Sequence, residues 1–248
     1  MYNKGVVKIK SSIIIMSFLM NQRESAYRKN SDNILSMYED SSGDVKFLDL
    51  GCDDGKWTMK MARRIGTEKV YGTEILEESA NQAKKNGVEV SIGDLNKRLP
   101  YKDEMFDVVH ANQVIEHLND TDMFLDEVYR ILKPGGYAVI STENLASWHN
   151  IGALILGFMP FSLTNISSKK AAIGNPLAPH AGKEATIASS WQHMRIFTIY
   201  GLKELSREVG FIVERVLASG YYPLGSWFSK IDPNHSHFFV LKLRKGTN

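Results

Sequence analysis

The fold is decided by Val45-Lys46-Phe47-Leu48-Asp49-Leu50-Gly51-Cys52-Asp53-Asp54-Gly55-Lys56. The apolar run before Gly51 is too short for a helix, which predicts a buried strand. Gly51 and Gly55 permit a tight turn and close approach of the backbone. After Gly55, apolar residues recur at helical spacing up to Ile65, which predicts a helix. Strand, glycine loop and helix together form the opening unit of a nucleotide-binding α/β sheet.

The charge of this loop narrows the ligand that it suits. Asp49, Asp53 and Asp54 lie in or beside the loop. Phosphate sites use bare backbone amides and a helix N-terminus, and carboxylates at this place would repel a pyrophosphate. The loop therefore suits a ligand that lacks phosphates and carries positive charge.

Three further strands extend the same pattern. Residues 69–74 read as a strand that ends on the acid Glu74, and a carboxylate at this tip can accept hydrogen bonds from both ribose hydroxyls. Residues 88–92 predict a third strand, followed by Gly93, Asp94 and Leu95. A fourth strand is expected from Phe106 onward. These features indicate a nucleoside-binding edge.

Four motifs then occur in a fixed order: the loop itself, a Leu99-Pro100 approach to Phe106-Asp107, Glu116-His117-Leu118, and Leu132-Lys133-Pro134-Gly135-Gly136 before a fifth strand at 137–142. With this order and spacing, residues 45–142 resemble the class I S-adenosylmethionine-dependent methyltransferases, in particular the type-11 methyltransferase domain. Asp53 departs from the pattern, because it stands where the loop of that family usually has its middle glycine.

The resemblance implies S-adenosylmethionine as the cofactor, whose sulfonium and ammonium groups suit an acidic loop. It assigns these residues to cofactor binding: Asp49, Gly51, Cys52, Asp54, Gly55, Glu74, Ile75, Asp94, Leu95 and Asn112. For Asp94 the alternative is a turn aspartate that caps its own loop.

The catalytic candidates are two histidines. His193 and His117 could take the proton of an incoming hydroxyl group as neutral imidazoles. Arg195 could clamp the acceptor, and His149 and Tyr27 are further substrate candidates. Alternatively, His117 holds its local loop together, His193 and Arg195 brace a loop as a pair, and Tyr27 only packs. No metal site is expected, since the sulfonium is already activated and positioning supplies much of the catalysis.

The expected architecture is an α/β domain with a Rossmann-like, seven-stranded, mostly parallel sheet and helices on both faces. Residues 1–44 are expected to form an N-terminal extension and helical cover, and 45–248 the methyltransferase domain. A lid insertion is expected at 143–195, with an apolar helix over 145–161, and an antiparallel edge hairpin from 211–217 and 237–243.

The composition of the chain limits the kinds of molecule that it is expected to bind. The chain has 248 residues, of which 43% are hydrophobic and 23% charged, and a net charge of +2. Its basic pairs are interleaved with acids, so no nucleic-acid partner is expected. The single cysteine excludes a disulfide within the chain and favours the cytoplasm. The apolar run at 13–20 is shorter than the roughly 20 residues that span a bilayer, although 151–161 could rest on a membrane surface. The oligomeric state stays open.

The function expected from the sequence is methyl transfer to a small-molecule acceptor, most simply a hydroxyl oxygen of a sugar, a lipid-linked intermediate or another partly apolar metabolite. Three alternatives stay open: a nucleotide-dependent dehydrogenase, a non-catalytic protein that binds S-adenosylmethionine, and an RNA methyltransferase.

Overall fold

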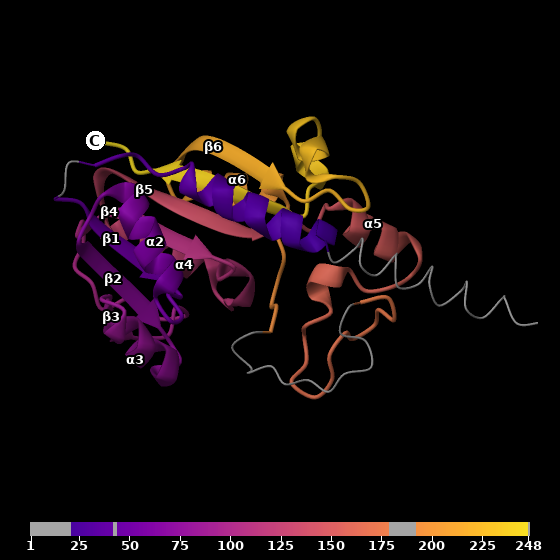
Figure 1. Cartoon of the computed structure of the whole chain (residues 1–248), viewed down its shortest axis with the longest axis horizontal. Helices are drawn as coiled ribbons and strands as arrows, with labels where there is room; N and C mark the ends of the chain where they lie inside the picture. The colour runs from indigo at the N-terminus through magenta and orange to yellow at the C-terminus, as the bar shows by residue number, and fades with distance from the viewer. Residues whose placement is uncertain (1–20, 42–43, 179–191, 248) are drawn as a thin grey trace, which may run out of the picture.

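The computed structural model describes residues 21–41, 44–178 and 192–247 (Figure 1). The expected N-terminal extension at 1–20 and part of the expected lid, residues 179–191, lie outside the described residues. Within the described ranges, no helix is both long enough and apolar enough to cross a bilayer.

The centre of the fold is one twisted sheet. Its strands are β1 Lys46–Leu50, β2 Lys69–Glu74, β3 Glu89–Ile92, β4 Phe106–Asn112, β5 Leu132–Glu143, β6 Ile212–Ser219 and β7 Phe238–Arg244. They lie in the order β3-β2-β1-β4-β5-β7-β6. All neighbours pair in parallel except β7, which is antiparallel to both β5 and β6. The predicted mostly parallel sheet with an antiparallel end is confirmed.

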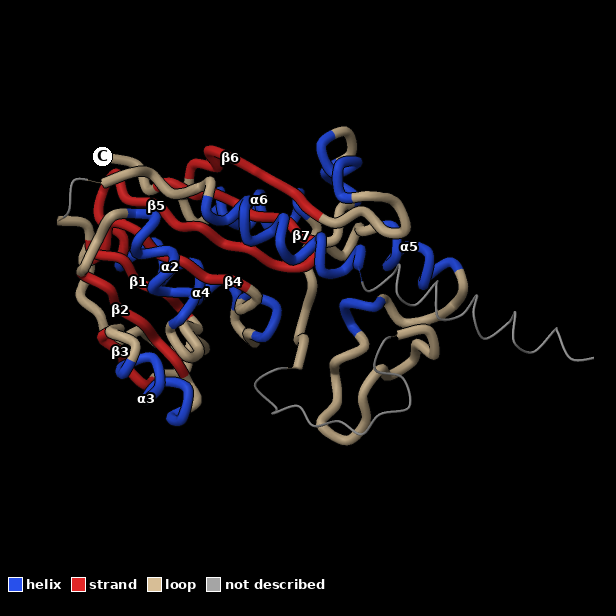
Figure 2. Tube along the Cα trace, viewed as in Figure 1, coloured by secondary structure: helices blue, strands red, loops and turns tan. Residues whose placement is uncertain are grey.

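Helices cover both faces of this sheet (Figure 2). They are α2 Lys56–Ile65, α3 Glu77–Lys85, α4 Thr121–Ile131, α5 Trp148–Ile155 and α6 Ile199–Glu208, with a further helix at 21–35. Successive side chains of a strand point to opposite faces. Leu48 and Leu50 of β1 accordingly join one apolar cluster with α4 and α6, whereas Phe47 joins a second cluster with α2, α3 and the residues after the first helix.

The helix at 21–35 is fastened across the β5-β7-β6 side of the sheet. Asn30 Nδ2 donates to Ser141 Oγ in β5 at 3.0 Å, and Asn33 Nδ2 donates to the Ala218 carbonyl in β6 at 3.1 Å. Tyr27 on the same helix places its ring centroid 4.9 Å from that of Phe238 in β7. Tyr27 therefore packs against the sheet, as the packing alternative proposed.

Two expected boundaries are wrong. The helix expected over 145–161 is only α5, which ends at Ile155 shortly before Gly157 with φ of 76°. A turn was expected at residues 133–136, before the fifth strand. In the structure these residues belong to β5, and the pairing of β5 with β4 is irregular there. Phe106 pairs with Leu132 and Val108 with Tyr137, so the residues between them bulge out of register.

The parallel strands bring their carboxyl ends to one edge of the sheet. The glycine loop follows β1, Glu74 ends β2, Asp94 comes soon after β3 and Asn112 ends β4. The long connection after β5 also leaves from this edge and extends beyond the sheet (Figure 1). Ligands of open α/β sheets bind at such an edge.

Candidate functional site

The glycines of the loop provide backbone surface without side chains. Gly51 has φ of 79°, and a Cβ atom there would lie 2.8 Å from Val114 Cγ2. Gly55 has φ of 76° and precedes α2, and a Cβ atom there would lie 2.9 Å from Ala83 Cα. Both positions require glycine, for conformation and for space.

Asp53 adopts the left-handed conformation at the place where glycine was expected. Its φ is 45°, which aspartate tolerates better than most residues. Its amide donates to Glu74 Oε2 at 3.0 Å, and its side chain accepts a hydrogen bond from Ser79 Oγ at 2.9 Å. These bonds hold the turn closed, so the departure from the family pattern preserves the shape of the loop.

Asp49 is a buried carboxyl group beneath the loop. Thr58 Oγ1 donates to its Oδ2 at 2.6 Å. Burial raises the pKa of Asp49 to about 7, although the Thr58 hydrogen bond opposes the rise and the negative charge of Glu74 adds to it. A cation placed above the loop would favour the ionised form. The electrostatics therefore fit a positively charged ligand, as the sequence predicts.

Glu74 is fixed at the tip of β2 by three backbone amides. Its Oε1 accepts from the amides of Ile75 and Leu76, each at 2.9 Å, and its Oε2 accepts from Asp53. Carboxylate oxygens can accept more than one hydrogen bond, so Glu74 keeps capacity for ribose hydroxyls. The Ile75 side chain beside it is 47% exposed, which offers an apolar surface at the same edge.

The remaining loop residues mainly support the turn. The Cys52 thiol is buried against Gly72, and its carbonyl accepts from the Gly55 amide at 2.9 Å. Asp54 forms an ion pair with Lys56 at 2.6 Å. Any contact of Cys52 with a cofactor would have to come from its backbone edge.

Asp94 caps its own turn, which is the alternative that the sequence left open. Its Oδ1 accepts from the amide of Asn96 at 2.9 Å and from the side-chain nitrogen of Asn96 at 3.0 Å. Its Oδ2 lies 3.8 Å from Lys97 Nζ. Leu95 packs partly buried against the core. Asp94 is thus placed at the ligand edge with one oxygen committed to the turn.

Two unpartnered polar atoms lie at the carboxyl end of β4. Asn112 Oδ1 and Gln113 Nε2 are buried and lack hydrogen-bond partners among the described residues. Gln113 also has a positive φ of 54°. Buried polar atoms are nearly always paired in folded proteins, so an acceptor and a donor in this state indicate a polar ligand. An ammonium and a carboxylate, such as those of the methionine half of S-adenosylmethionine, fit this pair.

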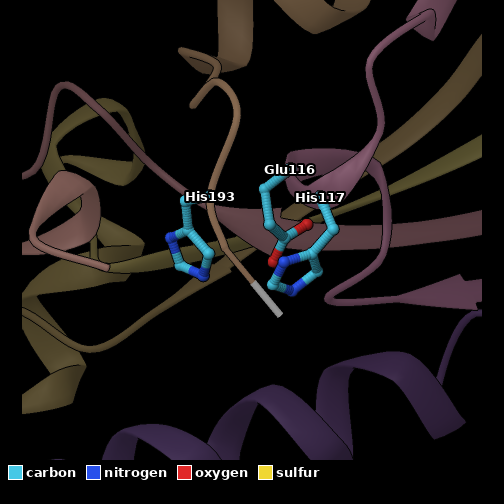
Figure 3. A group of neighbouring side chains, drawn as sticks. All are labelled: Glu116, His117 and His193. Atoms are coloured by element: carbon cyan, nitrogen blue, oxygen red, sulfur yellow. The ribbon is translucent and has the colours of Figure 1, made fainter. Parts of the chain in front are cut away.

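The two histidines that the sequence singles out lie together (Figure 3). His117 ends the short helix η1, Ile115–His117, and its ring centroid lies 4.8 Å from that of His193. The buried Glu116 lies beside them and accepts from Thr142 Oγ1 at 2.8 Å. Sequence reasoning did not select Glu116 as a site residue, although it precedes His117 in a recognised motif.

The guanidinium group of Arg195 binds residues outside the cluster of Glu116, His117 and His193. The group donates to the Asn119 carbonyl at 2.5 Å and to Thr121 Oγ1 at 3.1 Å. These contacts fasten the segment after the insertion to the start of α4. Arg195 therefore braces this loop in the structure, which is the alternative to binding the acceptor.

His149 belongs to a neighbouring aromatic cluster. Its ring centroid lies 4.6 Å from that of His237, 5.4 Å from Tyr222 and 5.7 Å from Phe161. Burial lowers the pKa of His149 to about 3, and the nearby His237 adds to this effect. His149 is therefore neutral at physiological pH and adds to a largely buried aromatic cluster.

A cleft of about 610 Å³ lies elsewhere, beside the starts of β1, β3 and β5. Its lining includes Lys46, Glu89 and Lys133, near the amino ends of their strands. The cleft lies at the amino ends of the strands and the glycine loop at their carboxyl ends, so the cleft is not part of the site around the loop.

The sheet order and the acidic edge define a class of protein: an α/β domain that holds a nucleoside cofactor at the carboxyl ends of its strands. Residues 48–140 match the family model described as "Methyltransferase domain". This region is therefore a class I S-adenosylmethionine-dependent methyltransferase domain of the type-11 family, and the cofactor of such a domain is S-adenosylmethionine.

Related proteins agree with this family. The chain is 30% identical over 115 residues to an uncharacterized methyltransferase of Schizosaccharomyces pombe, covering 41% of each protein. It is 32% identical over 109 residues to a mitochondrial ubiquinone biosynthesis O-methyltransferase of Rattus norvegicus, covering 40% of this chain and 31% of that protein. The matches thus span less than half the length of these relatives.

A solved structure shares the fold along almost the whole chain. It is a S-adenosylmethionine-dependent methyltransferase of Thermotoga maritima, described as a possible histamine N-methyltransferase. The TM-score is 0.60 at 20% identity, with 97% of this chain and 95% of that chain covered. The similarity therefore extends the fold assignment beyond residues 48–140.

Proposed function

We propose that the protein transfers the methyl group of S-adenosylmethionine to a hydroxyl oxygen of a small, partly apolar acceptor. One observation carries the proposal: the acidic, glycine-lined loop with Asp49 and Glu74 shares an edge of the sheet with the His117 and His193 imidazoles. A cofactor that carries positive charge and a group that can receive a proton are thereby brought to the same place.

The cofactor half of the proposed site rests on hydrogen-bonding capacity. Glu74 would bind the ribose hydroxyls, Asp94 and Leu95 would flank the adenine, and Asn112 would accept from the ammonium group. The unpartnered Asn112 Oδ1 supports the last assignment. When bound, S-adenosylmethionine supplies an activated methyl group on sulfur. The loop residues hold and orient it, and the connection after β5 excludes water as the proposed lid.

The acceptor half rests on the aromatic cluster around His149. His237 contacts both Tyr222 and Phe238, and the exposed Tyr27 contacts Phe238. Aromatic surfaces bury flat, partly apolar molecules well. The ubiquinone biosynthesis O-methyltransferase among the relatives is named for an oxygen acceptor. A hydroxylated aromatic compound is therefore the acceptor class that we favour.

The acceptor proton needs a recipient near the oxygen. The Nδ1 atoms of His117 and His193 lie against backbone carbonyls, so the Nε2 atom of each neutral ring carries a lone pair. The atoms balance when the acceptor O–H bond breaks, an oxygen–carbon bond forms and the carbon–sulfur bond breaks. One proton then leaves through the imidazoles to solvent.

The first experiment is calorimetric titration with S-adenosylmethionine, S-adenosylhomocysteine and NADH. We expect both adenosyl ligands to bind, and Glu74→Gln to weaken them at least tenfold. Glu78→Gln is the matched control, because Glu78 is an exposed acid on α3. Transfer of labelled methyl to hydroxylated aromatics, compared with sugars, then tests the acceptor. Binding of NADH alone would refute the proposal, and adenosyl binding without turnover on either panel would refute its catalytic part.

The cellular setting is also proposed. The single cysteine, Cys52, is buried, which suits a reducing compartment such as the cytoplasm. The proposed partner is a small molecule and not a nucleic acid.

A further inference from the structure

Three side chains from two distant segments of the sequence converge beside the proposed acceptor site. Glu116 and His117 lie in η1, at the carboxyl end of β4, and His193 comes from the segment after the insertion. One ligand atom from each of Glu116, His117 and His193 lies within 4.8 Å of the others. Figure 3 shows these three side chains as neighbours, with the Glu116 carboxylate beside the His117 ring.

The protonation of the two imidazoles follows from their partners. His117 Nδ1 contacts the Gln192 carbonyl at 3.1 Å, and His193 Nδ1 contacts the Ser162 carbonyl at 2.6 Å. A carbonyl can only accept a hydrogen bond, so both Nδ1 atoms must carry the proton. In the neutral rings both Nε2 atoms are then lone-pair nitrogens. A backbone carbonyl that fixes one ring nitrogen is the usual support for a metal ligand on the other.

Glu116 supplies an oxygen in an unusual state. The side chain is completely buried, and its Oε2 is occupied by Thr142. Its Oε1 has no hydrogen-bond partner among the described residues. An unpaired carboxylate oxygen in the interior is costly unless a cation or a proton compensates it.

The surroundings are rigid and acidic. The Glu116 carbonyl accepts from the amides of Met194 at 2.8 Å and Arg195 at 3.3 Å, so η1 and the segment of His193 are joined directly. A second acid, Glu143, is close enough to His193 for their charges to interact. The backbone bonds fix the positions of the three side chains, and the carboxyl groups of Glu116 and Glu143 favour a cation over an anion between them.

We propose that Glu116, His117 and His193 form a binding site for a divalent transition-metal cation. Two imidazole nitrogens and one carboxylate oxygen suit Zn²⁺, Mn²⁺, Fe²⁺ or Co²⁺ better than the all-oxygen preference of Mg²⁺ or Ca²⁺. Ligand atoms of a tetrahedral zinc site lie roughly 3.4 Å apart, so small rotations of the three side chains close the remaining distance.

Three protein ligands leave at least one position on the ion open, which is the arrangement of catalytic and not structural sites. A role of the open position toward the acceptor oxygen rests on the proposed function, whereas the binding of the ion does not. The ion and the acceptor proton would use the same Nε2 lone pairs, so the base role of His117 and His193 belongs to the ion-free protein. The site also revises the expectation, drawn from the sequence, that no metal is involved.

The test is titration of the full chain, dialysed against a chelator, with Co²⁺ as a spectroscopic probe. We expect one Co²⁺ per chain with visible d–d absorption typical of nitrogen and oxygen ligands, and competition by Zn²⁺. Glu116→Gln keeps an oxygen for Thr142 but removes the charge, and His193→Gln removes a ring nitrogen. Each should weaken Co²⁺ binding at least tenfold. His235→Gln is the control, because His235 pairs with Asp232 and is not among the clustered ligand residues.

The outcomes separate the two proposals. Absent Co²⁺ binding, or binding unchanged in both variants, overturns the metal site, even if S-adenosylmethionine binds to the same samples. Co²⁺ binding that the variants abolish supports the site, even if S-adenosylmethionine fails to bind and the proposed function falls. Thermal unfolding of each variant verifies that it is folded, and if Glu116→Gln is not, His193→Gln and His117→Gln decide the question.

Discussion

At the scale of single residues, the buried carboxyl group of Asp49 lowers the stability of the ligand-free protein once it is ionised. Its side chain is only 4% exposed and its pKa is about 7, against 3.8 for an ordinary aspartate. At pH values between 3.8 and about 7, Asp49 is therefore protonated in the folded chain and ionised in the unfolded chain. The contribution of Asp49 to stability is present at low pH and is lost as the pH rises from about 4 to above 7.

Asp49→Asn removes this penalty. We expect the free energy of unfolding of the ligand-free chain to rise at pH 8 by on the order of 2–4 kcal/mol, and to change little at pH 4. Affinity for S-adenosylmethionine should fall, since the compensating charge is gone. Urea denaturation at both pH values measures the effect, with the exposed Asp53→Asn as control. Equal stabilisation at pH 4 and pH 8 would contradict the assigned pKa.

Gly51 and Gly157 form a natural pair for testing the loop. Both have positive φ, of 79° and 76°, but a Cβ atom on Gly51 meets Val114, whereas one on Gly157 meets nothing within 4 Å. Gly157→Ala should cost about 1 kcal/mol through backbone strain alone and leave cofactor affinity unchanged. Gly51→Ala should cost more and weaken cofactor binding at least tenfold, as measured by denaturation and calorimetry. Equal effects of the two variants would show that the space above Gly51 is not needed.

At the scale of elements, the helix at 21–35 depends on polar contacts with the sheet. Asn30 is 5% exposed and bonds to Ser141, and Ser219 Oγ lies 3.4 Å from Asn30 Oδ1. Asn30→Ala leaves two buried hydroxyls without this partner, so we expect a loss of about 1–3 kcal/mol in urea denaturation. Asn21→Ala, on an exposed position of the same helix, should be nearly neutral. Alanine is the better helix former, so helix propensity opposes the expected loss; a loss in Asn30→Ala no larger than that in Asn21→Ala would contradict the docking role.

The elements themselves were largely predictable, because their signals are local. Apolar runs bounded by turn residues located β1 to β4. The bulge at 133–136 was not predictable, since it depends on the register that β4 imposes. The Glu116 cluster was equally hidden, because Thr142 and His193 reach it only through the tertiary fold.

At the scale of the whole molecule, buried histidines oppose Asp49 on the acid side. Burial lowers the pKa values of His110 and His149 to about 3 each. Both rings are neutral in the folded chain but protonated in the unfolded chain below about pH 6.5. Their contribution to stability is thus full above that pH and is lost as the pH falls toward 3.

The two effects predict a maximum in the stability of the ligand-free protein. Below about pH 6.5 the histidines make stability rise with pH, while Asp49 and Glu116, whose pKa burial raises to about 8, oppose them. Above that value only the penalties of these two acids still change, so stability should decline toward pH 8. Denaturation midpoints across pH 4 to 8 at constant ionic strength measure this curve. Stability that still increases between pH 7 and 8 would contradict it.

The position of β7 has a consequence for synthesis on the ribosome. β7 lies between β5 and β6, so β6 has no place in the sheet until residues 238–244 have been made. Until then β5 presents an open apolar edge, and pairing across about a hundred residues closes slowly. A nascent chain interrupted before Phe238 would therefore carry a finished cofactor loop on an unfinished sheet, and such fragments should be substrates for chaperones and proteases.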